Sequence, residues 1–180
     1  MPESGVRLAR TSDVDGIAAV NVRAWRQRFA TTLPTDLLGA LDVGDLAMVW
    51  ASGILNPPTP GHRLLVAVDD GEVVGYVAIG PSQDPDADEW TVELLALEVD
   101  PTRQRLGHGS RLMAAAIDHA RGAGMLSGCA WCPIDDEARR AFLQSAGWGP
   151  DTAFRDVFVG EATDGTDLLV REARLVTSLA

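Results

Sequence analysis

The sequence predicts an α+β fold in which a central sheet of about seven strands is flanked by about four helices. Three observations indicate this fold. Strand-like and helix-like segments follow one another in the order β-α-α-β-β-β-α-β-α-β-β. Two pairs of strand segments are joined by turn-forming residues, which is typical of antiparallel hairpins. A strand, a glycine-containing loop, a helix and a further strand form the central unit of the chain.

The first third of the chain predicts one strand and two helical stretches. Residues 6–10 alternate apolar and basic side chains, as a strand does. Thr11 or Ser12 can cap the helix that follows, and Pro34 ends it. Residues 35–55 then have helical periodicity.

The middle of the chain predicts a hairpin and a strong strand. We expect a break in the second helical stretch near Gly44, and a loop at 56–61. Two β-rich runs within 62–80 surround Asp69-Asp70-Gly71, which indicates a tight hairpin turn. Residues 90–99 form the next strand.

The last elements are expected to be a helix, a strand, a short helix and a hairpin, at residues 110–123, 127–134, 135–147 and 154–176. Asp135 or Asp136 can cap the short helix. With no repeat, low-complexity tract or long linker in 180 residues, we expect a single domain over 1–180.

Composition limits the possible partners and compartments. The chain has 26 acidic and 15 basic residues, a net charge of −11, which argues against a nucleic-acid-binding surface. The same charge favours a cationic small molecule or peptide as the partner; the alternative is that it serves only solubility. No apolar run approaches the roughly 20 residues that cross a bilayer, and the first ten residues lack a signal-peptide core. We therefore expect a cytoplasmic protein with no membrane partner.

The glycine loop in "RQRLGHGSRLM", residues 103–113, predicts a phosphate-binding site. The first N–H groups of a helix have no internal partners and carry the positive end of its dipole. Glycines let the backbone approach a ligand closely, so the loop is a candidate pyrophosphate cradle. The P-loop ending is absent, and Leu112 stands where a dinucleotide fingerprint needs glycine. The alternative is that the glycines only form a tight turn.

The loop and its surroundings resemble the GCN5-related N-acetyltransferase (GNAT) superfamily. Residues 104–109, Gln-Arg-Leu-Gly-His-Gly, match the acyl-CoA loop pattern Gln/Arg-x-x-Gly-x-Gly/Ala. The segments "VRLARTSDVDGIAAV", "LLVAVDDGEVVGYVAIG" and "ARRAFLQSAGW" resemble the opening strand and helix, the next two strands and the late helix of that family. The resemblance covers nearly the whole chain and implies a mixed, mostly antiparallel sheet.

The resemblance also implies where acetyl-CoA binds as co-substrate. Its pyrophosphate would lie on the backbone amides of residues 105–110. Its pantetheine arm would run between strand 90–99, which is bulged in this family, and strand 127–133. The residues implied are Leu97, Val99, Gln104, Arg105, Leu106, Gly107, His108, Gly109, Ser110 and Asp136. The Leu97 N–H would stabilise the developing oxyanion. The amine attacks the thioester directly, so neither a cysteine nucleophile nor a metal is expected.

Glu93 is the first candidate for the general base. An attacking amine has a free pKa near 10 and must lose a proton. Glu93 lies eleven residues before Gln104, where histone-type members of the family carry their base, and burial in its apolar strand would raise its pKa. Regular alternation predicts that Glu93 and Glu98 face opposite sides. The alternatives are Glu98, a water-mediated or substrate-supplied route, and an ordinary solvent-facing role for Glu93.

The late helix departs from the family pattern. Leu143 occupies the position where many members carry a tyrosine that protonates the leaving thiolate, and Asp136 replaces an asparagine. A CoA thiol has a pKa near that of cysteine, about 8.5, so a dedicated acid can be dispensable. Water or Cys132 are the possible substitutes. This departure leaves a non-catalytic acyl-CoA-binding or partner-binding module as the alternative to an enzyme.

Other polar and aromatic groups predict less. Cys129 and Cys132 form C-x-x-C on a strand, where positions three apart face opposite sides, so we expect core cysteines and neither zinc nor a disulfide. Three tryptophans fall where the acceptor pocket of the family forms, with core packing as the alternative: Trp25, Trp50 and Trp90. An acidic loop can attract an amine cation or be merely solvated: Asp84, Asp86, Asp88 and Glu89.

The residues and the family resemblance together predict an acyl-CoA-dependent N-acyltransferase, with acetyl from acetyl-CoA as the expected group and a primary amine as the acceptor. The acceptor, a small molecule or a peptide or protein amine, is not identified by the sequence. A homodimer is possible.

Overall fold

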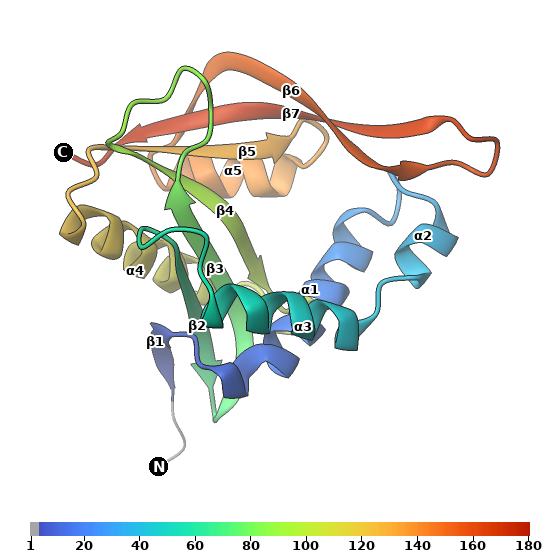
Figure 1. Ribbon diagram of the computed structural model, residues 1–180, viewed down its shortest axis with the longest axis horizontal. Helices are drawn as coiled ribbons and strands as arrows, with labels where there is room; N and C mark the ends of the chain where they lie inside the picture. The colour runs from blue at the N-terminus through green and yellow to red at the C-terminus, as the bar shows by residue number, and fades with distance from the viewer. Residues whose placement is uncertain (1–3) are drawn as a thin grey trace.

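The computed structural model describes residues 4–180, and its seven strands form one sheet in the order β1-β2-β3-β4-β5-β7-β6 (Figure 1). The strands are β1 Gly5–Leu8, β2 Arg63–Asp69, β3 Glu72–Pro81, β4 Thr91–Val99, β5 Ser127–Pro133, β6 Gly149–Glu161 and β7 Asp167–Ser178. Of the neighbouring pairs, β4 and β5 are parallel and the others antiparallel. The expected mixed, mostly antiparallel α+β fold is confirmed.

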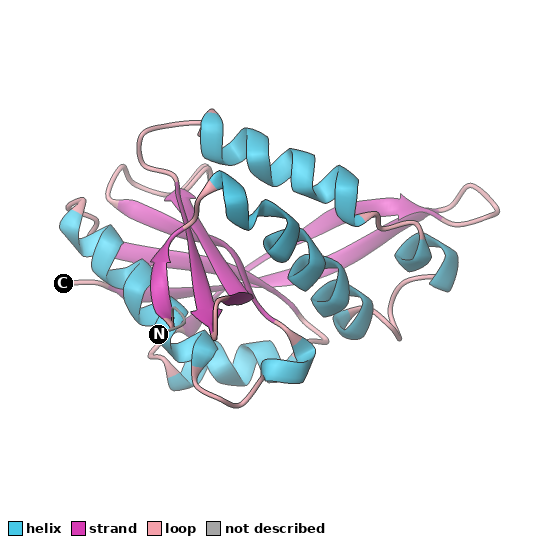
Figure 2. Ribbon diagram, turned by 90° about the horizontal axis from the view of Figure 1, so that it is seen from below, coloured by secondary structure: helices cyan, strands magenta, loops and turns pink. Residues whose placement is uncertain are grey.

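The helices cover both faces of the sheet (Figure 2). They are α1 Val14–Arg28, α2 Thr35–Gly39, α3 Val43–Leu55, α4 His108–Gly122 and α5 Glu137–Ser145, with short 3-10 turns at Thr11–Asp13 and Pro101–Arg103. The larger apolar core, the α4-side core, joins the sheet to α4 and to Leu143 of α5. The smaller α1-side core contains Ile17 and Val20 of α1 and Tyr76 of β3.

The first helix begins later and ends earlier than the sequence predicts. No side-chain cap from Thr11 or Ser12 forms; instead Asp13 precedes α1, and its carboxylate accepts hydrogen bonds from the Arg7 guanidinium and the Arg10 N–H. This carboxylate therefore ties the helix start to β1. α1 ends at Arg28, and the residues before Pro34 form turns.

The break between the second and third helices lies just before the expected position. α2 ends at Gly39, and α3 starts at Val43 because Asp42 accepts a hydrogen bond from the Asp45 N–H and caps it. The hairpin turn between β2 and β3 is confirmed. Asp70 and Gly71 both have positive φ, 56° and 84°, as a two-residue turn of this type requires.

The final hairpin is longer than the sequence predicts. β6 starts at Gly149 rather than near Phe154, because Gly149 and Pro150 already pair with β7; the ladder is then interrupted and resumes at Phe154. Thr152, with a φ of 75°, lies in this interruption. Turn-type residues inside such an irregular strand give no local strand signal, which is why the sequence predicts a shorter hairpin.

The central feature of the sheet is the separation of β4 from β5. The two strands pair only where Thr91–Leu94 meets Ser127–Ala130. Beyond that point β4 continues beside β3, and β5 continues beside β7. In the β3–β4 ladder Leu94 pairs with Ile79 and Ala96 with Ala78, so Leu95 is a β-bulge. The bulge and the gap that the family resemblance implies are both present.

Among residues 4–180, no helix has the length and apolar character needed to cross a membrane.

Candidate active site

A cavity of about 1010 Å³ lies where β4 leaves β5. Its wall is formed by the end of α1, the second half of β4, the start of α4, the β5–α5 connection and part of β7. Nine of the ten residues implied as cofactor-binding line it: Leu97, Val99, Gln104, Arg105, Gly107, His108, Gly109, Ser110 and Asp136. The tenth, Leu106, has an exposed side chain outside the wall. The fold therefore gathers these residues around one space.

The N-terminus of α4 has the geometry of an anion site. Gly107, with a φ of 82°, is the N-cap of the helix, and Arg105 also has a positive φ of 64°. The first turn contains no acidic residue, so the helix dipole is not neutralised there. Converging N–H groups at such a turn favour phosphate oxygens.

His108 is the buried polar group of this turn. Its Nδ1 lies 3.0 Å from the Arg111 guanidinium, and its Nε2 is buried without a hydrogen-bond partner among the described residues. Burial, and then the nearby Arg111 charge, lower the pKa of His108. The imidazole is therefore neutral near pH 7, and the positive character of the turn comes from its arginines and N–H groups.

The open edge of β4 offers peptide groups to the cavity. The Leu97 carbonyl accepts a hydrogen bond from Arg139 Nη1 at 2.9 Å, and the Val99 carbonyl accepts one from Gln104 Nε2 at 3.4 Å. Neither Arg139 nor Gln104 belongs to β3, so the two carbonyls point away from the β3–β4 ladder. Because the N–H and C=O of one strand residue point to the same side, the N–H groups of Leu97 and Val99 face the same open edge.

An ion-pair cluster closes one wall of the cavity. The Arg28 guanidinium at the end of α1 contacts the Glu98 carboxylate at 2.5 Å and the Asp136 carboxylate at 3.1 Å. Asp136 also caps α5, because it accepts a hydrogen bond from the Arg139 N–H. Sequence reasoning missed Arg28 and Arg139, since nothing local to α1 or α5 indicates that their side chains meet at β4.

The expected placement of the two acidic residues on β4 is wrong. Val92, Leu94 and Leu97 all belong to the α4-side core, so Glu93 and Glu98 both face the other side of the sheet. The bulge at Leu95 adds one residue and reverses the alternation. Of the two, Glu98 lines the cavity and Glu93 does not.

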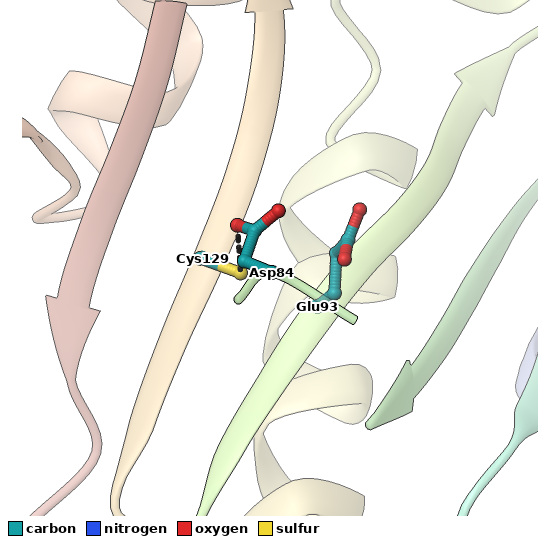
Figure 3. A group of neighbouring side chains, drawn as sticks. All are labelled: Asp84, Glu93 and Cys129. Atoms are coloured by element: carbon teal, nitrogen blue, oxygen red, sulfur yellow. Dashed lines mark hydrogen bonds between the residues drawn. The ribbon is translucent and has the colours of Figure 1, made fainter. Parts of the chain in front are cut away.

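Glu93 lies in a separate cluster with Asp84 and Cys129, in which Glu93 and Cys129 are buried and Asp84 is partly buried (Figure 3). The ligand-type atoms of these three residues lie within 4.8 Å of one another, and Glu93 is only 8% exposed. Burial, and then the neighbouring Asp84 charge, raise the pKa of Glu93. The direction of this pKa shift agrees with the expectation that burial raises the pKa of the Glu93 carboxyl.

The acidic loop before β4 is largely held in place rather than merely solvated. Arg174 of β7 contacts Asp84 at 3.2 Å and Asp86 at 2.6 Å, and the Trp131 indole N–H donates to Asp84. Asp88 accepts hydrogen bonds from Trp90 and Thr91 at the start of β4. These contacts fix the loop against the sheet.

No tyrosine or cysteine supplies an acid to the cavity wall. Leu143 is 1% exposed and packs in the α4-side core, and Tyr76 is buried in the α1-side core against Trp50. Both cysteines are free and buried, and burial raises the pKa of each thiol to about 11. Cys129 faces Glu93 and Cys132 faces the α4-side core, which confirms the expected core placement on opposite faces.

The three tryptophans considered for an acceptor pocket lie outside the cavity wall. Trp25 and Trp90 are 40% and 47% exposed. Trp50 packs against the α1-side core, and its indole N–H donates to Asn21 at 3.2 Å. The aromatic residues that do line the cavity are Phe29 and Phe142.

Comparison with known proteins agrees with this geometry. The model of the acetyltransferase (GNAT) family matches residues 22–148. The chain belongs to this family. As a GNAT protein it is an acetyl-CoA-dependent N-acetyltransferase, so the expectation of an enzyme is confirmed over that of a non-catalytic module.

Two curated relatives share the family. An uncharacterized N-acetyltransferase of Bacillus subtilis (strain 168), YuaI, is 29% identical over 154 residues, which cover 85% of this chain and 83% of that protein. The mycothiol acetyltransferase of Kineococcus radiotolerans is 31% identical over 134 residues, 74% of this chain but 38% of its own length.

Solved structures show the same GNAT fold. An N-acetyltransferase from Staphylococcus aureus Mu50 superposes with a TM-score of 0.72 at 18% identity, with 99% of both chains covered. PaiA N-acetyltransferase from Thermoplasma acidophilum, solved in complex with coenzyme A, has a TM-score of 0.71 at 15% identity, with 98% and 99% covered.

Proposed function

We propose that the cavity binds acetyl-CoA with its pyrophosphate against the backbone from Arg105 to Ser110 and its pantetheine arm along the open edge of β4. One observation carries the proposal: the gap between β4 and β5 opens into the same cavity as the glycine-capped N-terminus of α4. The helix terminus suits phosphate oxygens, and the strand edge suits amide groups. The Leu97 N–H then stabilises the developing oxyanion.

Direct attack by a primary amine is the proposed chemistry. The bond from the amine nitrogen to the acetyl carbon forms, the carbon–sulfur bond breaks, and the electron pair leaves with sulfur. The amine gives up a proton to a base. Because both cysteine thiols are buried and protonated near pH 7, this chain offers no cysteine nucleophile for a covalent acetyl-enzyme.

Glu93 remains the proposed base. Its raised pKa suits proton transfer near neutral pH, whereas the Glu98 carboxylate is engaged by Arg28. Glu93 lies outside the cavity wall, so water must carry the proton from the amine to it. Asp136 is the proposed partner of the pantetheine arm, although Arg28 and the α5 N-terminus already hold its carboxylate.

The proposed acceptor is a small-molecule amine or a peptide or protein amine in the cytoplasm. Among structural relatives, the protein solved from Brucella melitensis is a ribosomal-protein-alanine N-acetyltransferase. The net charge of −11 favours cationic acceptors. A homodimer stays a prediction.

A thiol-release assay with acetyl-CoA tests the proposal. The panel should contain peptides with free N-termini, polyamines and aminoglycosides, with CoA binding followed in parallel by calorimetry. We expect saturable CoA binding and turnover with at least one class. Absence of CoA binding would overturn the assignment of the cavity, and binding without turnover on the whole panel would contradict the proposed acceptor classes.

A further inference from the structure

Arg139 spans the gap between α5 and the open edge of β4. It lies in the first turn of α5, and its Nη1 donates to the Leu97 carbonyl at 2.9 Å. The same nitrogen is 4.0 Å from the Glu98 carboxylate. The side chain is 11% exposed and lines the cavity. A guanidinium therefore lies next to the peptide whose edge the thioester is proposed to follow.

The two arginines of this wall differ in how their charge is compensated. Arg28 makes close ion pairs with two carboxylates, those of Glu98 and Asp136. Arg139 has one carboxylate at 4.0 Å, and a guanidinium has five N–H donors. Burial, and then repulsion from Arg28, lower the pKa of Arg139. Even so, an arginine guanidinium is effectively always protonated in proteins, so Arg139 carries its charge near pH 7.

The position one turn further along α5 contributes no polar group. Leu143, four residues after Arg139, packs in the α4-side core and carries no group that could donate a proton. The sulfur that departs in acyl transfer carries a negative charge, which a protein stabilises either by protonation or by a fixed positive charge in a site of low dielectric.

We propose that Arg139 is a catalytic residue that stabilises the leaving CoA thiolate electrostatically, in place of a proton donor. The inference rests on the proposed function of the cavity. Arg139 keeps all its protons throughout. The amine proton goes to the base, the electron pair of the broken carbon–sulfur bond stays on sulfur, and the thiolate takes a proton from water after release.

The test is the pKa of the CoA thiol when CoA is bound, followed by the ultraviolet absorbance of the thiolate as pH is raised. Arg139→Gln removes the charge but keeps a polar side chain with N–H donors at this position. Arg140→Gln is the matched control, because Arg140 is its neighbour on α5, donates to the Ile134 carbonyl and lies outside the cavity wall.

We expect the native protein and Arg140→Gln to hold the bound thiol about one pKa unit or more below that of the free thiol, about 8.5. Arg139→Gln should return it to that value or above. With acetyl-CoA, Arg139→Gln should lower kcat by roughly 10²- to 10³-fold, the range for loss of one electrostatic donor. Arg139→Lys, which keeps the charge, should recover part of both effects.

Equal thiol pKa values in the native protein and Arg139→Gln would overturn the inference, as would weaker CoA affinity with no change in thiol titration. If Arg139→Gln does not fold, Arg139→Lys is the deciding variant. A bound-thiol pKa equal to that of the native protein, together with a kcat loss of roughly 10²- to 10³-fold, would also overturn the inference. Failure of the native protein to bind CoA would instead refute the proposed function.

Discussion

Glu93 and Glu98 lie on the same face of β4, although five positions separate them and regular alternation would place them on opposite faces. The bulge at Leu95 supplies the extra residue. Glu98 is consequently placed beside Arg28 at the cavity, and Glu93 beside Asp84 under the loop from β3. Two carboxylates of one strand therefore have different neighbours, and only Glu93 is the proposed base.

Glu93→Gln should lower the acyl-transfer rate by roughly 10²- to 10⁴-fold while CoA affinity stays unchanged. The native rate should rise with pH through the raised pKa of Glu93, and the variant should lack that step. One acceptor must be used for both proteins, because the amine also titrates. Native turnover with an unchanged pH profile would remove Glu93 from the mechanism.

The same variant should be more stable than the native protein at pH 8. The folded pKa of Glu93 is raised, so its contribution to stability is full below the unfolded pKa, about 4.3, and is lost as pH rises through the folded value. Glutamine carries no charge into the buried site. Thermal melts should show a gain of about 2–4 °C at pH 8 that shrinks toward pH 4. A gain that does not depend on pH would contradict the ionisation argument.

Gly109→Val should weaken CoA binding at least tenfold and leave the protein folded. Gly109 is in α4 with helical backbone angles, and an added Cβ would meet Phe142 at 3.6 Å, an ordinary contact. The larger side chain would nonetheless occupy the proposed pyrophosphate cradle. Gly122→Val at the far end of α4, where nothing lies within 4 Å of an added Cβ, is the control. Native affinity in Gly109→Val would mean that the glycines only form a turn.

Asp100→Asn should destabilise the protein by about 1–3 kcal/mol. Asp100 is 6% exposed and accepts hydrogen bonds from Thr102 and Arg23. Burial opposes its ionisation, but the bonds from Thr102 and Arg23 prevail and lower its pKa. The stabilisation is therefore present above the unfolded pKa, about 3.9, and is lost as pH falls. Denaturant titrations at pH 7 and pH 3 measure the free energy of unfolding of both proteins, with Asp167→Asn at an exposed position as control. An equal loss of unfolding free energy at both pH values would contradict this pH dependence.

A protein with both cysteines replaced by alanine should keep native acyl-transfer rates within about threefold. The thiols are buried with pKa values of about 11, so neither is a thiolate near pH 7. Thiol-modifying reagents should react with the native protein only after unfolding. A large loss of turnover in a double variant with an unchanged melting temperature would show that a cysteine takes part in the chemistry.

Much of the fold was accessible from local patterns. Alternation and turn residues identified seven strands, and the glycine loop at Gly107 and Gly109 indicated a phosphate-type site. These features depend on neighbours in the chain, because a glycine with positive φ or a two-residue turn is set by a few adjacent residues. The ends of elements were predicted less accurately. The sequence places the end of α1 at Pro34, but the helix ends at Arg28, because tertiary packing rather than a local signal sets this end.

The sequence by itself determined the strands and helices, the glycine-capped start of α4 and the candidate role of Glu93 as a buried acid. Only the tertiary structure decided that Glu98 rather than Glu93 lines the cavity, and that Arg28 and Arg139 meet β4 there. The physical reason is that one unpaired residue in a β3–β4 ladder reverses every later side chain, and that Arg28 reaches Glu98 across 70 positions of the chain. Such contacts depend on how whole elements pack, which no local spacing records.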